Sequence, residues 1–97
     1  MKIAIAVIED DKNAEIAKQA GRAPFYLIFE DKKFVETIKN PFSVGGGGAG
    51  LGVAKMLADK NVDKIISGEF GDKMINSLRE RGVQFEESVE DIAEVMQ

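Results

Sequence analysis

The chain of 97 residues contains no histidine and no cysteine. Without cysteine it forms no disulfide and cannot ligate an iron–sulfur cluster with its own thiolates. Its serines have no imidazole to activate them, which excludes a Ser-His-Asp hydrolase. Any site must therefore be built from backbone amides, hydroxyls, carboxylates or cations. We expect a non-enzymatic protein with no catalytic residue and no metal-ligating residue.

Long apolar runs and an excess of positive charge are also missing. The longest apolar run, Ile3–Ile8, is far shorter than the roughly 20 residues that span a bilayer, and the first residues lack the features of a signal peptide. Seventeen acidic and thirteen basic residues give a net charge of −4 and are mixed along the chain. This leaves no basic stripe for a nucleic-acid backbone. We expect a cytoplasmic protein that binds neither membrane nor nucleic acid.

The pattern of apolar residues predicts an α/β fold with a mixed five-stranded sheet. Residues 3–8 are continuously apolar and rich in β-branched side chains, as in a central strand that is covered on both faces. Two runs at 24–29 and 34–38 flank a charged link and predict a hairpin. Short strands are expected at 62–67 and 83–86. The helices between the later strands imply parallel pairing there.

Three helices are expected, and residues 14–20 have weak helical character. The first helix follows a glycine run, and its buried face is predicted to carry Leu51, Val53, Ala54, Met56, Leu57 and Ala58. The second spans 72–81, with Asp72 at its positive end and Gly82 just after its last turn. Ser88 and Asp91 resemble a capping box that opens a last helix. The apolar face of that helix is predicted to carry Val89, Ile92, Ala93 and Met96.

Six of the ten glycines fall between Gly45 and Gly52, directly before the first helix. A glycine-rich turn into a helix aims unpaired N–H groups and the positive end of the helix dipole at one point, which suits an anion. The candidate binding residues in this loop are Gly45, Gly46, Gly47, Gly48, Ala49 and Gly50.

Two other functions are open for this glycine loop. The spacing of Gly45, Gly47 and Gly50 matches the dinucleotide fingerprint weakly, so a nucleotide- or phosphate-binding module is an alternative. The other is a mobile connection that orders on a partner protein.

A second glycine turn and an arginine extend the candidate site. Ser67, Gly68 and Gly71 lie between a predicted strand and a predicted helix, so they should reach the same carboxyl edge of the sheet as the first loop. Arg22 can supply a bidentate cation to an anionic ligand, with a structural ion pair as the alternative. Together these residues predict a crevice that accepts a small anionic ligand.

Three motifs carry a family resemblance: residues 21–26 (Gly-Arg-Ala-Pro-Phe-Tyr), 47–51 (Gly-Gly-Ala-Gly-Leu) and 65–71 (Ile-Ile-Ser-Gly-Glu-Phe-Gly). In this order they resemble the dinitrogenase iron-molybdenum cofactor biosynthesis family over nearly the whole chain, so one domain of this type is expected over residues 1–97. The resemblance implies a ribonuclease-H-like, three-layer fold with sheet order 3-2-1-4-5 and helices on both faces. It also implies a non-catalytic role in binding or carrying an iron–sulfur or iron-molybdenum cluster during nitrogenase assembly.

Two positions depart from the family pattern. The family often has a histidine two residues before the glycine of the first motif and another at the start of the second motif, and these positions hold Gln19 and Gly47. A bare iron cluster would therefore need a ligand from elsewhere, whereas an already ligated, anionic cofactor can still be held by amides and Arg22. The expected partners are a small anionic ligand or metal cluster, with a partner protein as a further candidate.

Overall fold

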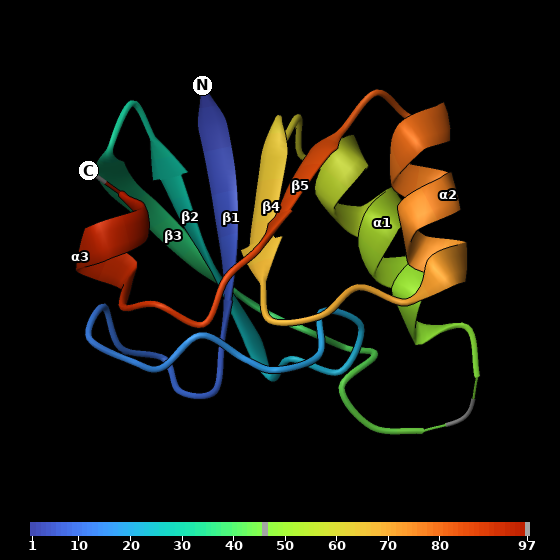
Figure 1. The fold of residues 1–97 in the computed structure, drawn as a ribbon, viewed down its shortest axis with the longest axis horizontal. Helices are drawn as coiled ribbons and strands as arrows, with labels where there is room; N and C mark the ends of the chain where they lie inside the picture. The colour runs from blue at the N-terminus through green and yellow to red at the C-terminus, as the bar shows by residue number, and fades with distance from the viewer. Residues whose placement is uncertain (46, 97) are drawn as a thin grey trace.

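The computed structural model describes residues 1–45 and 47–96. The elements follow in the order β1 (Lys2–Val7), β2 (Phe25–Glu30), β3 (Lys33–Lys39), α1 (Ala49–Asp59), β4 (Lys64–Ser67), α2 (Asp72–Glu80), β5 (Gln84–Glu87) and α3 (Ile92–Val95). Figure 1 shows one twisted sheet, with α1 and α2 to one side of it and α3 to the other. The predicted α/β fold is confirmed.

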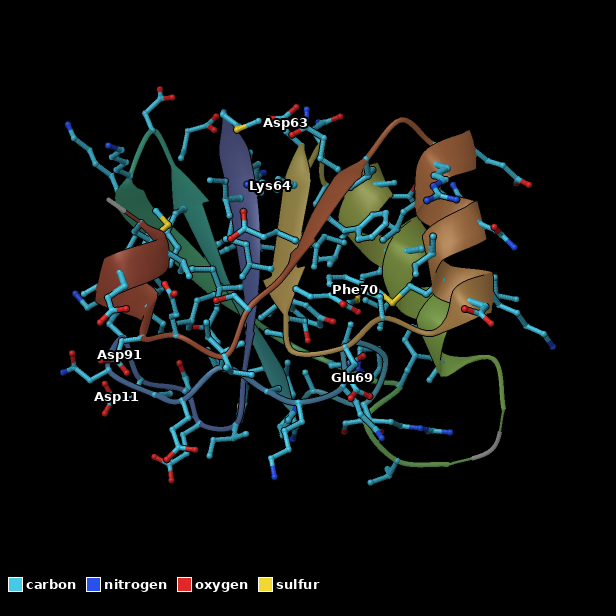
Figure 2. All side chains as sticks on the ribbon, in the orientation of Figure 1. Asp11, Asp63, Lys64, Glu69, Phe70 and Asp91 are labelled. Carbon is cyan, nitrogen blue, oxygen red and sulfur yellow. The ribbon has the colours of Figure 1, made fainter. Side chains whose placement is uncertain are left out.

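The strands lie in the order β3-β2-β1-β4-β5, which is the order that the family resemblance implies. β1 pairs antiparallel with β2 and parallel with β4, while β2–β3 is an antiparallel hairpin and β4–β5 a parallel pair. Consequently β1, β3, β4 and β5 run in one direction, and their carboxyl ends meet at the lower side of Figure 1. We call this side the carboxyl edge. Asp11, Glu69 and Asp91 mark it in Figure 2, whereas Asp63 and Lys64 mark the opposite edge.

The central strand β1 sends alternate side chains into two cores. Ala4 and Ala6 belong to the core beneath α1 and α2, whereas Ile5 and Val7 belong to the core beneath α3. All four residues are fully buried. Because successive side chains of a strand point to opposite faces, a continuous apolar run is what a strand between two helical layers requires.

The buried face of α1 differs from the predicted one at its start. Val53, Ala54 and Leu57 are buried as predicted, but Leu51 is 46% exposed. In Figure 1 the first turn of α1 extends below the end of β4, so no strand covers it there. Leu51 faces a cavity instead.

The ends of α2 agree with the prediction. Asp72 lies in the first turn, and Arg81 is the residue that caps the helix at its carboxyl end. Gly82 follows with φ 72°, a left-handed conformation that glycine adopts without strain.

The capping box predicted at Ser88 and Asp91 is not formed. Asp91 precedes α3, but its side chain makes no capping hydrogen bond. Ser88 N donates to Ser67 O at 2.8 Å, which keeps the chain paired to β4 where a helix would begin. The helix is consequently a single short turn, and Val89, predicted on its apolar face, is 85% exposed, whereas Ile92 is buried.

Residues 14–20 form no helix, despite their weak helical character. With residues 21–24 they make up an irregular stretch along the carboxyl edge, which we call the edge segment (residues 14–24). Ile16 pairs with Val7, and Gln19 pairs with Glu69, in isolated bridges. Backbone pairing to the ends of two strands therefore outweighs local helix propensity here. Within residues 1–45 and 47–96, no helix has the length and apolar character needed to cross a membrane.

Candidate functional site

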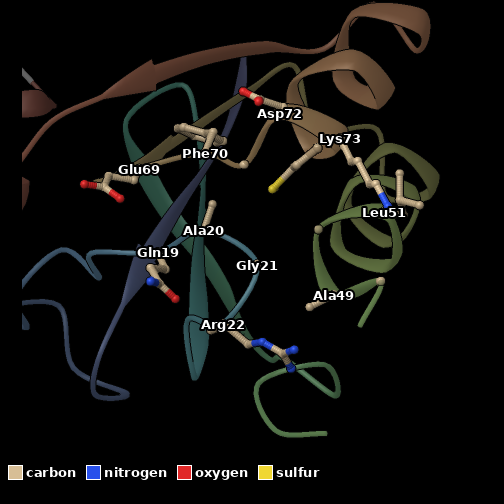
Figure 3. Close-up of a pocket in the computed structure, with 14 residues that line it drawn as sticks. Gln19, Ala20, Gly21, Arg22, Ala49, Leu51, Glu69, Phe70, Asp72 and Lys73 are labelled. Atoms are coloured by element: carbon tan, nitrogen blue, oxygen red, sulfur yellow. The ribbon is translucent and has the colours of Figure 1, made fainter. Parts of the chain in front are cut away.

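A cavity of about 420 Å³ opens at the carboxyl edge, and three separate segments form its walls (Figure 3). The walls are residues 19–22 of the edge segment, residues 48–51 at the start of α1, and residues 69–74, which lead into α2. Small-ligand sites commonly have volumes of about 300–1,000 Å³. The position outside the carboxyl ends of parallel strands is where open α/β sheets bind ligands.

The α1 wall is a helix N-terminus without a side-chain cap. Gly48 occupies the capping position with φ 85° and ψ 7°, and glycine has no side chain with which to cap. The first bond of the helix runs from Gly52 N to Gly48 O at 3.0 Å, so the N–H groups of residues 49–51 have no acceptor within α1. The first turn of this fully described helix contains no acidic residue to offset the helix dipole. This wall favours a negatively charged group.

The α2 wall carries charges of both signs. Glu69, Asp72 and Lys73 all line the cavity, and Asp72 offsets the positive end of α2. In Figure 3 the carboxylates of Glu69 and Asp72 are turned away from Arg22, while Lys73 extends toward Leu51 of α1. The side formed by α1 and Arg22 is therefore the one that suits an anion.

Arg22 lines the cavity from the edge segment. Its Nη1 donates a hydrogen bond to Phe42 O at 3.1 Å, which holds the guanidinium beside the loop that leads to α1. A guanidinium presents several N–H donors in one plane, so this bond is compatible with contact to an anion.

Two glycines allow the three walls to approach one another closely. A Cβ on Gly21 would lie 3.1 Å from Gly50 N, and a Cβ on Gly50 would lie 2.9 Å from Met74 Cβ. Both distances are shorter than normal carbon contacts. A side chain at position 50 would force the walls of α1 and α2 to shift, and one at position 21 would make an unusually tight contact with the backbone of α1.

The structure brings part of the predicted site together. Five predicted binding residues line the cavity: Arg22, Gly48, Ala49, Gly50 and Gly71. Gly45 and Gly47 are exposed and lie outside this lining. Gly46, which was also predicted, lies outside the described residues.

Ser67 and Gly68, also predicted, are not among the residues that line the cavity. Ser67 is fully buried, and its Oγ donates to Ala17 O at 3.1 Å. Gly68 N donates to the same oxygen at 2.8 Å, and a Cβ on Gly68 would lie 2.7 Å from Lys18 O. Their observed contacts hold the edge segment against β4.

Several lining residues were not predicted from the sequence, among them Leu51, Glu69, Asp72, Lys73 and Met74. The predicted start of α2 at residue 72 was a usable signal for Asp72 and Lys73, because first-turn residues flank a helix N-terminus. Leu51 was missed because its helical periodicity predicted a place in the core. Met74 was missed because it reaches the cavity only through the tertiary contact between the starts of α1 and α2.

The sequence matches the family described as dinitrogenase iron-molybdenum cofactor over residues 1–97. The chain belongs to this family. Its fold is similar to that of the apo form of the orange protein from Desulfovibrio gigas, with a TM-score of 0.89 and 20% identity over 99% of this chain and 83% of that one. It is also similar to a NifB-like protein from Thermotoga, with a TM-score of 0.76 and 22% identity over 93% and 77% of the two chains. No curated protein matches the sequence.

In this dinitrogenase cofactor-family member, the donor set does not suit direct metal ligation. Residues 1–45 and 47–96 contain no group of three or more acidic side chains that could hold a metal ion, and the sequence supplies no histidine or cysteine. A bare iron cluster, which takes thiolate or imidazole ligands, does not fit. An anion that brings its own ligands does fit, because amides and a guanidinium bind it without replacing those ligands.

Proposed function

We propose that this family member is a non-enzymatic binding or carrier domain, whose cargo is an already ligated, anionic iron–sulfur or iron-molybdenum cluster. The observation that carries the proposal is the convergence of the uncapped α1 N-terminus and Arg22 on one cavity of suitable volume. Family membership supports a cargo related to the nitrogenase cofactor. We further propose that the domain works in the cytoplasm, as a chain without disulfides suggests.

The cavity would hold such a cargo by charge, amides and shape. The α1 amides and Arg22 attract negative charge, while Glu69 and Asp72 repel it, so the α1 side carries the binding. Apolar lining from Leu51 and Met74 suits the weakly hydrated sulfide surface of a cluster. In this arrangement the cluster keeps its own ligands when it binds, so it can be released unchanged.

Anaerobic titration with a thiolate-capped iron–sulfur cluster, a dianion, tests the proposal. We expect binding to the wild type and a loss of about 10- to 100-fold in affinity for Arg22→Ala, because hydrogen bonds to charged groups contribute about 1.5–3 kcal/mol. Arg81→Ala is the matched control, since it removes the same charge at the far end of α2. Equal affinity for wild type and Arg22→Ala, or an equal loss in the control, would contradict the role of Arg22.

The same titration with inorganic phosphate and with ATP addresses the nucleotide alternative. Of the three fingerprint glycines, only Gly50 lines the cavity, so their spacing does not form a single phosphate cradle. We therefore expect both probes to bind more weakly than the cluster. Tighter binding of ATP would replace the proposal with a nucleotide-binding module, and binding of no probe would favour an interaction domain.

A further inference from the structure

We infer that Asn40 is a positioning residue that orients Arg22 for ligand binding, an inference that rests on the proposed function. Asn40 is a buried polar residue that is only 1% exposed. A buried side-chain amide is destabilising unless it is hydrogen-bonded. Its partners therefore show what it holds in place.

The amide nitrogen of Asn40 fixes the backbone on both sides of Arg22. Asn40 Nδ2 donates to Gly21 O at 3.1 Å and to Ala23 O at 2.8 Å. The backbone nitrogen of Asn40 also donates to Pro24 O at 2.9 Å. With both flanking carbonyls held, the direction in which the Arg22 side chain leaves the edge segment is set.

The amide oxygen of Asn40 places the acceptor at the far end of that side chain. Phe42 N donates to Asn40 Oδ1 at 2.9 Å, and Phe42 O accepts the bond from Arg22 Nη1 at 3.1 Å. The Phe42 ring in turn lies against α1 at Gly52, where a Cβ would come within 2.5 Å of Phe42 Cζ. One buried side chain thus sets both the base and the tip of Arg22, relative to the first turn of α1.

This arrangement prepares the cavity before a ligand arrives. An arginine side chain has many rotamers, and restricting it in advance reduces the entropy that is lost on binding. Asn40 itself does not line the cavity. Its substitution should therefore weaken binding only through Arg22.

A double-mutant cycle with the thiolate-capped iron–sulfur cluster tests this inference. We expect Asn40→Ala to lower the affinity about tenfold when Arg22 is present, and less than twofold in the Arg22→Ala background. Gly52→Ala, which displaces the Phe42 ring but leaves Asn40 in place, should show the same dependence on Arg22. Val62→Ala is the control for lost stability, because Val62 is a core residue near the opposite edge of the sheet.

The possible outcomes separate this inference from the proposed function. A wild type that binds no cluster contradicts the proposed function. Two outcomes overturn only the role of Asn40, provided that the wild type binds the cluster through Arg22. In one, Asn40→Ala binds as tightly as the wild type; in the other, Asn40→Ala lowers the affinity equally with and without Arg22. A measurement without ligand completes the test: the ¹⁵N NMR order parameter of Arg22 Nε–H should fall in Asn40→Ala and not in Val62→Ala. An unchanged order parameter overturns the inference even if no probe binds.

Discussion

Tyr26 links the middle of the sheet to the cavity through one hydroxyl group. It is the largest of the fully buried side chains, and its hydroxyl donates a hydrogen bond to the carbonyl oxygen of Ala20. Ala20 in turn lines the cavity. Burial raises the pKa of Tyr26 well above its ordinary value, because a phenolate would lose its hydration in these surroundings.

Alkaline titration should reveal this burial. Because the pKa of Tyr26 is raised in the folded state, its contribution to stability is complete below about pH 10, the ordinary tyrosine pKa, and is lost as the pH rises further. Tyr26 is the sole tyrosine and tryptophan is absent, so phenolate absorption reports on it alone. We expect this absorption to appear only as the protein unfolds.

Tyr26→Phe is the matched variant for that titration. It should lower the free energy of unfolding by about 1–3 kcal/mol at neutral pH, because Ala20 O loses its donor, and it should show a weaker decline above about pH 10. Phenolate absorption near the ordinary pKa in folded wild type would contradict this account.

At the scale of single residues, the sequence predicts the site residues that can be recognised from their own type and their immediate neighbours in the chain. Arg22 and the glycines at the start of α1 were predicted because a cation and a glycine turn before a helix are recognisable by themselves. Asn40 was not, because an asparagine before a proline is typical of the end of a strand. Its hydrogen-bond partners at Gly21 and Ala23 lie 19 and 17 residues earlier in the chain, and no local pattern records them.

At the scale of the helices, a close contact between α1 and α2 shapes the site. It falls in the first turn of each helix, where Gly50 faces Met74. Periodicity predicted both helices, since an apolar stripe depends only on the chain's own residues. It also predicted the last helix, α3, although Val89 lies outside that helix and is exposed. The weak helical character of residues 14–20 gave no structure for this stretch, which is paired to the ends of β1 and β4 through isolated bridges.

Gly50→Ala should therefore destabilise the protein, although alanine is the better helix former by about 1 kcal/mol. The added Cβ would lie 2.9 Å from Met74 Cβ, and overpacking of this kind costs about 1–3 kcal/mol. Gly47→Ala is the control, because nothing lies within 4 Å of its Cβ position, and we expect a change within about 0.5 kcal/mol. Urea denaturation measures both variants; a Gly50→Ala protein as stable as wild type would refute the close packing.

In the whole molecule, an irregular segment joins the ends of two parallel strands. Ala17 N donates to Ala6 O at 2.8 Å, and Ala17 O accepts from Gly68 N at 2.8 Å. Parallel pairing was predicted from the helices between the later strands, whereas the sheet order was implied only by the family resemblance. The bridge through Ala17 was not predicted, because non-local backbone pairing leaves no trace in composition or periodicity.

Hydrogen exchange should detect this bridge. The amides of Ala17 and Gly68 are hydrogen-bonded between segments, so they should exchange only when the carboxyl edge opens. We expect the amides of Ala17 and Gly68 to exchange on the order of a hundredfold more slowly than the amide of Lys12, which lies in an exposed turn. A hundredfold difference corresponds to about 2.7 kcal/mol more free energy for opening. If the exchange rates of Ala17 and Lys12 are equal after correction for the intrinsic rate of each amide, the edge segment is not hydrogen-bonded to the strands in solution.

The three walls of the cavity also have a consequence for synthesis of the protein. The first wall is translated early, at residues 19–22, but the last ends at residue 74. A nascent chain that ends just before residue 69 already contains β1, the β2–β3 hairpin, α1 and β4, yet it lacks the third wall of the cavity. If the proposed function holds, a chain that stops before residue 74 will not bind the ligand, because one of the three walls is incomplete.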